Sequence, residues 1–222
     1  MLTVTWYGHA AFKLESPEMS LILDPYKYPD AGGYLPINDS ADAVLISHIN
    51  DRYHSHTGQI SPGFELLEAH KFPSDGVWFR NVLFQSIPVF ETPEKLPDDE
   101  VTVFYFTMGG LKVVFLGDLG HPLTPRERAP LQSADLLIAS TGGKPTIALD
   151  ELLTLIDQIN PLWIIPMHFK TDKINLNILR NEEFMKLVAD RFEATYKADC
   201  STRLDPSEKP HSTTVIVLDH CR

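Results

Sequence analysis

Three histidines lie close together just after an apolar run in the first quarter of the chain. Val44 to Ile46 is apolar, and His48, His54 and His56 follow it among other polar residues. Such a run is typical of a buried strand, which would deliver the polar groups to one edge of a sheet. Imidazole nitrogen is a favoured ligand of zinc, so we expect the chemistry at this edge. The spacing of these histidines alone does not establish a metal site.

Two further apolar runs end in side chains that can bind metal. Val114 to Leu116 leads to Asp118, and Trp163 to Ile165 leads to His168. A single histidine after a strand is usually a core residue that bonds to the backbone. Because the pattern occurs three times, we predict that His48, Asp118 and His168 converge on one site. A divalent metal held there would turn a water molecule into a nucleophile near neutral pH.

Four other histidines have simpler interpretations. We expect His9 to orient the site or to pack beneath it, and His121 to support Asp118 from behind. His54 and His56 are expected to be exposed loop residues. In this interpretation none of the four binds the metal directly.

Length and composition bound the class of protein. The chain has 222 residues, is 43% hydrophobic and carries a formal charge of −11. These values suit one domain, residues 1–222, with a sizeable core. The acidic balance and the lack of a run of Lys and Arg argue against a nucleic-acid or anionic-membrane partner. We expect a small-molecule substrate instead, and a homo-oligomer stays open.

The sequence shows no targeting signal that would change this class. Met1 to Tyr7 lacks the regions of a signal peptide, and no apolar stretch approaches the length of a membrane span. Cys200 and Cys221 lie far from each other in the sequence and far from the histidines. We therefore expect neither a disulfide framework nor a cysteine zinc site. A cytoplasmic protein in a reducing compartment is the resulting prediction.

Local patterns predict many short strands and few helices. Ser61-Pro62 provides an N-cap and a first helical position for a short helix through Ala69. Apolar spacing predicts helices over Thr146 to Ile159 and Glu182 to Phe192. Tyr26 to Ser40 is rich in Pro, Gly, Tyr and Asp, which is typical of a long surface loop. The strands are expected at Leu2–Trp6, Ala10–Leu14, Ser20–Leu23, Ala43–Ile46, Val77–Phe79, Val82–Ile87, Val101–Phe106, Leu111–Leu116, Asp135–Ile138, Leu162–Ile165 and Thr213–Leu218.

Two segments of the chain repeat the same order of elements. Ala10 to Asp24 and Val101 to Asp118 each consist of a strand, a turn and an apolar strand that ends in aspartate. Two β-rich halves of this kind favour two sheets that face each other. The hairpins argue against a doubly wound parallel sheet.

Several segments together resemble one known family, the metallo-β-lactamase superfamily. The segments are W-Y-G-H-A-A-F (Trp6 to Phe12), L-D-P-Y (Leu23 to Tyr26), A-D-A-V-L-I-S-H (Ala41 to His48), F-L-G-D-L-G-H (Phe115 to His121), T-G-G-K-P-T-I (Thr141 to Ile147) and I-I-P-M-H-F-K-T (Ile164 to Thr171). They are most similar to the branch of small bacterial zinc-dependent hydrolases related to ascorbate-phosphate lactonases. The resemblance covers Trp6 to about Thr171 and implies a four-layer αββα sandwich, an α+β or α/β fold.

The resemblance also implies a set of metal ligands, from which this chain departs. The family has the motif H-x-H-x-D-H where this chain has His48 to Tyr53. Only His48 matches, because Asn50, Arg52 and Tyr53 stand where the family has His, Asp and His. Asp118 and His168 match the bridging aspartate and the final histidine of the family. The resemblance therefore implies that His48, Asp118 and His168 bind metal, with His48 and Asp118 as the catalytic residues.

Two alternatives concern the ligands that are missing. Glu91 stands where the family has a further histidine, so a carboxylate is a candidate replacement there. If the register shifts by one residue, Asp51 becomes a candidate ligand, with His54 or His56 reaching in from the next turn. We favour plain loss of the second metal over this shift.

Arg52 offers a further hypothesis about the lost metal. If Asp118 remains buried without its second metal, its charge needs a partner. A guanidinium can pair with a carboxylate through two parallel hydrogen bonds. We therefore predict that Arg52 folds inward and pairs with Asp118.

The combined prediction is a hydrolase with an altered metal site. It would hold zinc or another divalent metal, as a single ion or not at all, and would act on a small ester, lactone or phosphoester. The alternative is a non-catalytic binding or structural protein of the same fold that has lost its metals, because a fold does not by itself determine function.

Overall fold

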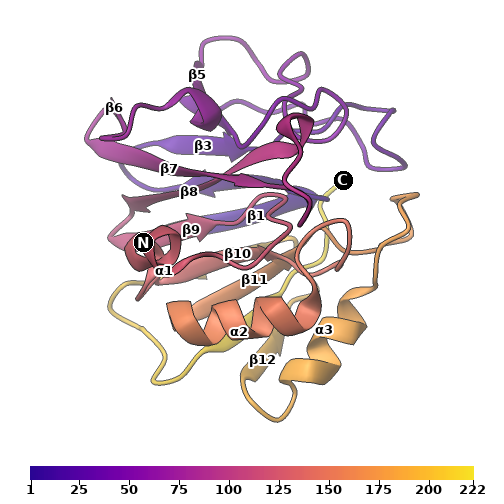
Figure 1. The fold of residues 1–222 in the computed structure, drawn as a ribbon. Helices are drawn as coiled ribbons and strands as arrows, with labels where there is room; N and C mark the ends of the chain where they lie inside the picture. Colours follow the sequence, from indigo (N-terminus) through magenta and orange to yellow (C-terminus); the bar gives the residue numbers. More distant parts are fainter.

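The computed structural model describes residues 1–222 as two β-sheets that pack face to face, with helices outside the larger sheet (Figure 1). The smaller sheet has six strands, in the order β13 (Ser201–Leu204), β1 (Leu2–Gly8), β2 (Ala11–Glu15), β3 (Ser20–Leu23), β4 (Ala43–Ile46) and β5 (Glu65–Glu68). The strands from β13 to β3 pair antiparallel, whereas β3, β4 and β5 run parallel. This sheet therefore delivers the residues after β3 and β4 to the same edge.

The larger sheet has eight strands. Their order is β12 (Glu193–Tyr196), β14 (Thr214–Val217), β11 (Trp163–Met167), β10 (Leu136–Ser140), β9 (Leu111–Phe115), β8 (Glu100–Met108), β7 (Val82–Phe90) and β6 (Val77–Phe79). The strands β9, β10 and β11 run parallel to one another, and β8 runs antiparallel to β9. The residues that follow β9 and β11 consequently meet at one edge of this sheet.

Apolar side chains between the two sheets form the main core. Phe12 of β2 packs edge-to-face on Phe115 of β9, and Phe104 of β8 stacks on the same Phe115 ring at 4.7 Å between centroids. All three side chains are fully buried. Burial of a phenylalanine side chain stabilises a fold by about 1.5–3 kcal/mol. The contact fixes how the two sheets lie relative to each other.

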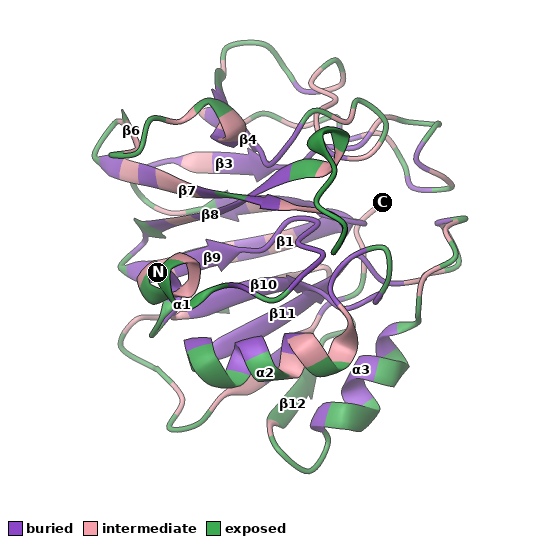
Figure 2. Ribbon diagram, in the orientation of Figure 1, coloured by how far each residue is buried: buried purple, intermediate pink, exposed green.

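Helices cover the outer face of the larger sheet. α2 (Leu149–Ile159) buries Leu152, Leu155, Ile156 and Ile159, which lie on one side of a helix at spacings of three and four. It ends at Asn160, whose φ of 54° is left-handed. α3 (Asn181–Val188) and the single-turn α1 (Pro125–Arg128) lie on the same side, and Figure 2 shows both long helices buried inward and exposed outward.

Loops rather than helices cover the outer face of the smaller sheet. Tyr26, Tyr34 and Ile37, from the long loop after β3, pack on Val44 and Ile46 of β4. The predicted sandwich of two facing sheets is confirmed, but its outer layer on this side is not helical. The predicted surface loop is thus anchored to the sheet by a few buried side chains, whereas Tyr28 to Asp30 stay exposed.

One local prediction is wrong, and three short strands were missed. The helix expected from Ser61 to Ala69 is replaced by β5 and a 3-10 turn, Ala69–Lys71, because pairing with β4 overrides the local capping signal. β12 and β13 were not predicted, and β12 is exposed along its whole length, so it has no apolar alternation. Each of these strands is four residues long.

The two cysteines form a disulfide bond, contrary to the sequence-based prediction. Cys200 and Cys221 are joined, with their Cα atoms 5.1 Å apart. Both ends are held against the same residue of β1: Trp6 N donates to Cys200 O at 2.8 Å, and Cys221 N donates to Trp6 O at 3.0 Å. Their proximity is therefore a product of the sheet and cannot be read from their sequence spacing.

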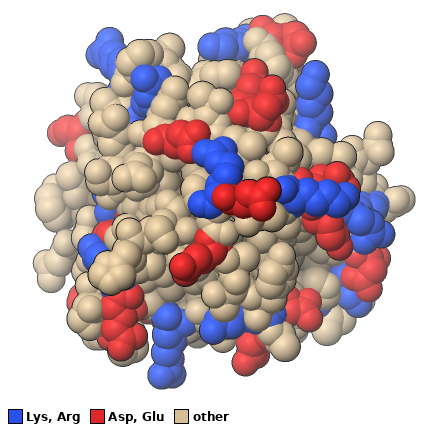
Figure 3. Space-filling view, turned by 90° about the horizontal axis from the view of Figure 1, so that it is seen from below, with Lys and Arg blue, Asp and Glu red and all other residues tan.

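The surface carries charges of both signs. On the face shown in Figure 3, acidic and basic side chains are interspersed. Several pair locally, such as Lys186 with Glu183 at 2.8 Å on α3. Such exposed pairs contribute at most about 1 kcal/mol each. None of the helices combines the length and the apolar character needed to cross a membrane.

Candidate metal centre

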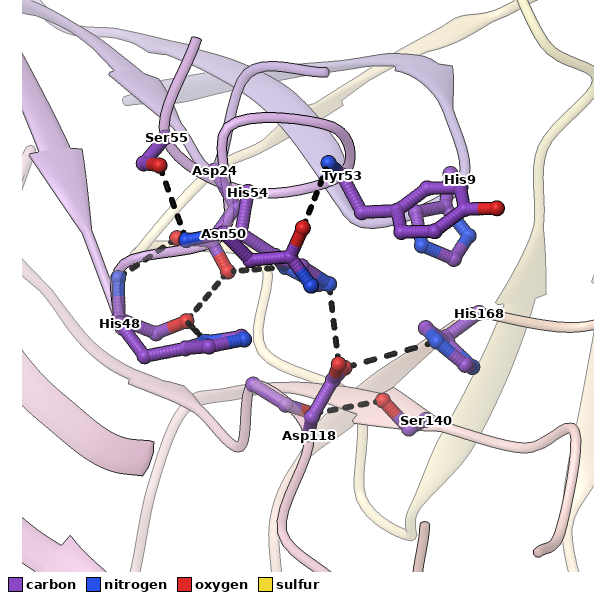
Figure 4. Close-up of polar contacts among 12 residues, drawn as sticks. His9, Asp24, His48, Asn50, Tyr53, His54, Ser55, Asp118, Ser140 and His168 are labelled. Atoms are coloured by element: carbon purple, nitrogen blue, oxygen red, sulfur yellow. Dashed lines mark hydrogen bonds and ion pairs between the residues drawn. The ribbon is translucent and has the colours of Figure 1, made fainter. Parts of the chain in front are cut away.

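Six buried titratable side chains meet at the edge where both sheets end (Figure 4). Each of four strands supplies one side chain just beyond its end: Asp24 after β3, His48 after β4, Asp118 after β9 and His168 after β11. His9 lies in the turn after β1, and His54 comes from the loop after β4. All six are at least nine-tenths buried.

Asp24 holds the first part of the cluster in place. Its Oδ1 accepts from Ser47 N at 2.7 Å, and its Oδ2 accepts from Ser47 Oγ at 2.6 Å. His54 Nδ1 lies 2.9 Å from the same Oδ2. Because an ionised carboxylate can only accept, the proton of this contact belongs to His54 Nδ1. Both oxygens of Asp24 are therefore occupied.

The same network sets the protonation of His48. Ser47 Oγ donates a hydrogen bond to Asp24, so it can only accept one from His48 Nδ1, which lies 3.0 Å away. His48 Nε2 is then left with a lone pair, and it is buried without a partner. Burial lowers the pKa of His48 to about 4, so this ring is neutral at pH 7. A neutral imidazole with a free Nε2 is the form that binds metal.

Asp118 lies opposite these rings. Its Oδ2 is 2.9 Å from His54 Nε2, and its Oδ1 is 3.6 Å from His168 Nε2 with no hydrogen bond of its own. Burial alone would raise the pKa of Asp118, but the neighbouring imidazoles of His54 and His168 hold it well below its usual range. The carboxylate is therefore ionised and faces ring nitrogens on two sides.

The contact between His54 and Asp118 calls for a positive charge. Burial lowers the pKa of His54, but the charges of Asp118 and Asp24 outweigh it and raise the pKa to about 10. With its Nδ1 proton directed at Asp24, His54 Nε2 either carries a second proton or presents a lone pair. A lone pair 2.9 Å from a carboxylate oxygen is stable only if a cation lies at the contact. The site is thus built for an added positive charge.

The backbone around the cluster adopts uncommon conformations. His9, Asp24 and His168 have φ values of 52°, 40° and 50°, which are left-handed. Such non-glycine residues are each strained by about 1–3 kcal/mol and persist only where the surrounding fold imposes them. Gly142 permits one of these conformations, because a Cβ there would lie 2.1 Å from the carbonyl oxygen of His168.

The structure brings together the three residues that the sequence singled out. His48, His168 and Asp118 lie in one cluster, linked through His54, so the predicted convergence is confirmed. Glu91 is half-buried at the end of β7, where burial and the charge of Asp118 raise its pKa. Gly120 allows this approach, since a Cβ there would meet the Glu91 carbonyl oxygen at 1.6 Å.

Asp51 does not reach the cluster. Its side chain is 64% exposed and pairs with His56 Nδ1 at 2.9 Å and Lys27 Nζ at 3.1 Å. The shifted register thus brings in His54 but neither Asp51 nor His56.

The predicted pairing of Arg52 with Asp118 is wrong. Arg52 is exposed, its Nε donates to the carbonyl oxygen of Asp30 at 2.6 Å, and its guanidinium lies 5.0 Å from the centre of the Tyr53 ring. The backbone N–H groups of residues 53, 54 and 55 all donate to the carbonyl oxygen of Asn50. This tight turn directs Arg52 outward and His54 inward, so an imidazole takes the place proposed for the guanidinium.

Two members of the cluster were missed by the favoured interpretation of the sequence. His54 was expected to be exposed but is 1% exposed, because the turn at Asn50 folds back on the cluster. Asp24 was assigned no role, although it follows the buried run Leu21–Leu23 in the same way that Asp118 follows β9. That pattern was a usable signal.

The two histidines expected to support the site occupy different roles. His9 packs against His168, with ring centroids 4.3 Å apart. His121 Nε2 accepts from Phe90 N at 3.2 Å, and its Nδ1 donates to the carbonyl oxygen of Pro122 at 2.9 Å. Both nitrogens of His121 are used, so this ring anchors the end of β7 beside Glu91.

A large cavity lies next to the cluster without containing it. Its volume is about 710 Å³, and it lies between the segment after β11 and α3. Trp6 and Phe169 form one wall, and Trp6 Nε1 donates to the carbonyl oxygen of His9 at 3.0 Å. The cluster is therefore identified by its chemistry and not by the size of a cavity.

Comparison with known proteins places this geometry in a family. Residues 3–168 match the Beta-lactamase superfamily domain, and this range contains all six side chains of the cluster. The chain belongs to the metallo-β-lactamase superfamily. A crystal structure of a superfamily member from Thermotoga maritima is 31% identical, with a TM-score of 0.74 over 98% of this chain and 99% of that chain.

Curated relatives extend the match beyond the domain. A UPF0173 metal-dependent hydrolase from Methanosarcina mazei is 23% identical over 213 residues, which covers 84% of this chain and 90% of the relative. A UPF0173 protein from Pyrococcus abyssi is 24% identical and covers 77% of this chain and 84% of its own length. The chain is thus similar to these relatives over most of their length.

Proposed function

We propose that the protein is a metal-dependent hydrolase that holds one divalent cation, preferably zinc, through His54, His168 and Asp118, with His48 beside them. The observation that carries this proposal is the contact of His54 Nε2 with Asp118 Oδ2 at 2.9 Å, in a ring whose other nitrogen is tied to Asp24. A carboxylate that fixes the far nitrogen of a histidine is the usual support of a metal-binding imidazole. The name of the Methanosarcina mazei relative supports the same activity.

The residues present fit a metal ion. His48 Nε2, Asp118 Oδ1 and one ring nitrogen of His168 are buried without partners. Leaving such an atom unpaired destabilises a fold by about 1–3 kcal/mol. Imidazole nitrogens with one carboxylate oxygen are a donor set that zinc favours. A bound cation and the water molecule beside it would together satisfy atoms that the protein itself leaves unpaired.

A single ion is favoured over a pair. Asn50, which stands where the family has a second histidine, uses its Oδ1 to accept from Tyr53 N at 3.3 Å. Arg52, at the position of the family aspartate, points away from the site. Glu91 stays a candidate additional ligand, since it is half-buried and close enough to feel the charge of Asp118.

The chemistry that follows is hydrolysis of an ester, lactone or phosphoester. A divalent ion here would polarise the substrate oxygen and lower the pKa of a water molecule to near neutrality. Asp118 Oδ1, which has no hydrogen bond, would accept the proton of the attacking water and orient it. Asp24 would hold His54 in one tautomer throughout the reaction. His48, neutral at pH 7, would offer a further acceptor through Nε2.

Metal analysis tests this proposal. Protein purified without chelators is expected to contain about one zinc or other divalent ion per chain, and the stripped protein should take up zinc in a calorimetric titration. The Asp118→Ala variant should lose this uptake, whereas His56→Gln, a partly exposed residue that pairs with Asp51 outside the cluster, should keep it. Hydrolysis of nitrophenyl esters, lactones and phosphodiesters should follow metal content. A wild-type protein that binds no metal and cleaves none of these substrates would favour the non-catalytic alternative.

A further inference from the structure

We propose that His9 is a ligand of the metal, and that it completes the set formed by His54, His168 and Asp118. The inference rests on the proposed metal site and adds a residue that comes from the opposite side of the cluster, at the end of β1. His9 would then supply a ligand that the loop after β4 does not provide.

The surroundings of His9 carry the proposal. Its side chain is fully buried, and neither of its ring nitrogens has a hydrogen-bond partner. Its ring centroid lies 4.3 Å from that of His168 and 5.3 Å from that of His54 (Figure 4). One donor atom from each of the three rings lies within 4.8 Å of the other two. Three imidazole nitrogens are therefore gathered around a common point.

An ordinary core role does not account for this residue. A neutral imidazole has one hydrogen-bond donor and one acceptor. Leaving either of them buried without a partner destabilises a fold by about 1–3 kcal/mol. His121, another buried histidine near this edge, has both nitrogens bonded. An apolar side chain of similar size in place of His9 would remove the two unpaired atoms. A histidine retained here is explained if one nitrogen acquires a partner that binds later.

The three rings must move closer together to bind one ion. Zinc–nitrogen bonds are about 2.0–2.1 Å long, so two nitrogens on one tetrahedral ion are about 3.4 Å apart. The donor atoms of the three rings lie within 4.8 Å of one another, so the rings must approach by up to roughly 1.4 Å, a shift that side-chain rotation can supply. Three imidazole nitrogens and an oxygen of Asp118 are donors that zinc favours, and zinc in catalytic sites can expand to five ligands, so a position for water would remain.

The proposal also explains how the site tolerates the outward turn of Arg52. The residue at the family's aspartate position is fastened to Asp30 on the surface and donates nothing to the cluster. His9 reaches the same cluster from β1, and its backbone carbonyl is held by Trp6 Nε1 at 3.0 Å and by His168 N at 3.1 Å. Those two hydrogen bonds fix the left-handed backbone from which the ring projects. A nitrogen ligand thus replaces a carboxylate ligand.

Cobalt spectroscopy and zinc titration of His9→Phe test the proposal. Phenylalanine keeps an aromatic ring against His168 but removes both nitrogens. Zinc affinity should fall by more than the roughly 10–100-fold that loss of a supporting residue produces. The visible absorption of the cobalt-loaded protein should change, and the metal-free variant should unfold at the same or a higher denaturant concentration than the wild type. Tyr53→Phe, whose ring lies 5.1 Å from His9, is the matched control and should keep the wild-type affinity and spectrum.

His9→Cys provides a second test, which looks for a new spectroscopic signal and does not depend on a loss of zinc affinity. If position 9 coordinates the metal, the cobalt-loaded variant should show a thiolate-to-metal charge-transfer band that the wild type lacks. A His9→Phe protein with wild-type zinc affinity and spectrum, together with no new band in His9→Cys, would overturn the role of His9. In that case the Asp118→Ala result would still decide the proposed function. A wild-type protein without metal uptake would remove both.

Discussion

Two polar clusters of the molecule differ in whether their buried side-chain atoms have hydrogen-bond partners. The metal centre contains five buried side-chain atoms without a hydrogen-bond partner, distributed over His9, His48, Asp118 and His168. The second cluster, which we call the Asp39 cluster, consists of Tyr7 of β1, Lys13 of β2 and Asp39 of the long loop. In it Tyr7 OH donates to Asp39 Oδ2 at 2.6 Å, and Lys13 Nζ donates to Oδ1 at 3.0 Å.

The difference separates a structural role from a functional one. Ser40 N also donates to Asp39 Oδ1, so each polar group of the Asp39 cluster has a partner from the chain itself. Such a network needs nothing further and fastens the loop to the sheet. The candidate metal centre, by contrast, leaves five buried atoms unpaired, as the proposed binding of a metal ion requires. Unpaired buried atoms, and not burial or charge alone, mark the site.

Removing Asp24 should have the largest effect on stability. In Asp24→Ala, Ser47 N, Ser47 Oγ and His54 Nδ1 all lose their acceptor inside the protein. Breaking a buried ion pair by removal of one partner destabilises a fold by about 3–5 kcal/mol. Urea denaturation of the metal-free variant should show a loss of that order. A loss below about 1 kcal/mol would mean that the cluster does not depend on this carboxylate.

The Asp39→Asn variant should show a smaller, pH-dependent loss and no effect on the metal. Asp39 is about a quarter exposed, so we expect about 1 kcal/mol at pH 7. Burial would raise the pKa of Asp39, but its bonds from Tyr7 and Lys13 outweigh burial and lower it below the ordinary value of 3.8. Its contribution is therefore present above pH 3.8 and is lost as the pH falls through the lowered value.

Denaturation between pH 3 and pH 7 checks this behaviour. The difference in unfolding free energy between the wild type and Asp39→Asn should be constant from about pH 5 upward and should shrink below pH 4. Zinc affinity should be the same in both proteins. A variant that loses zinc affinity would show that the two clusters are coupled, contrary to the separation drawn above.

Arg52→Ala should have the smallest effect of the three. The guanidinium lies on the surface and contacts a backbone carbonyl and the Tyr53 ring. Surface substitutions of this kind usually change stability by no more than about 0.5 kcal/mol. Thermal unfolding and zinc titration should both match the wild type. A loss of about 3–5 kcal/mol would instead restore the rejected pairing with Asp118.

The sequence predicted the part of the site that strands determine. His48, Asp118 and His168 each follow an apolar run, so their meeting at one edge could be inferred from local patterns and the resemblance. His54 could not be placed, since its direction depends on three backbone hydrogen bonds to Asn50. His9 could not be judged either, because its unpaired nitrogens are evident only when both sheets are assembled.

The fold likewise divides into elements that local sequence patterns predict and elements that depend on distant pairing. The long apolar strands and α2 carry strong periodic signals, and the structure contains them. β5 and β12 are short, mostly exposed edge strands, and they exist through pairing with β4 and β14. Pairing partners far away in the chain leave no mark on a local pattern. The disulfide between Cys200 and Cys221 depends on such pairing as well, through β1 and β13.

Asp24 also bears on how the sequence of this site can change over generations. The carboxylate that accepts the hydrogen bond from His54 Nδ1 directly follows β3, and it does not belong to the strand or loop that carries the histidine. What the loop after β4 must preserve is therefore a turn that presents an imidazole to Asp24. Its neighbours, such as Arg52, are then free to vary. Counting residues from His48 describes only the length of the loop, whereas the contact that positions His54 depends on its distance from Asp24.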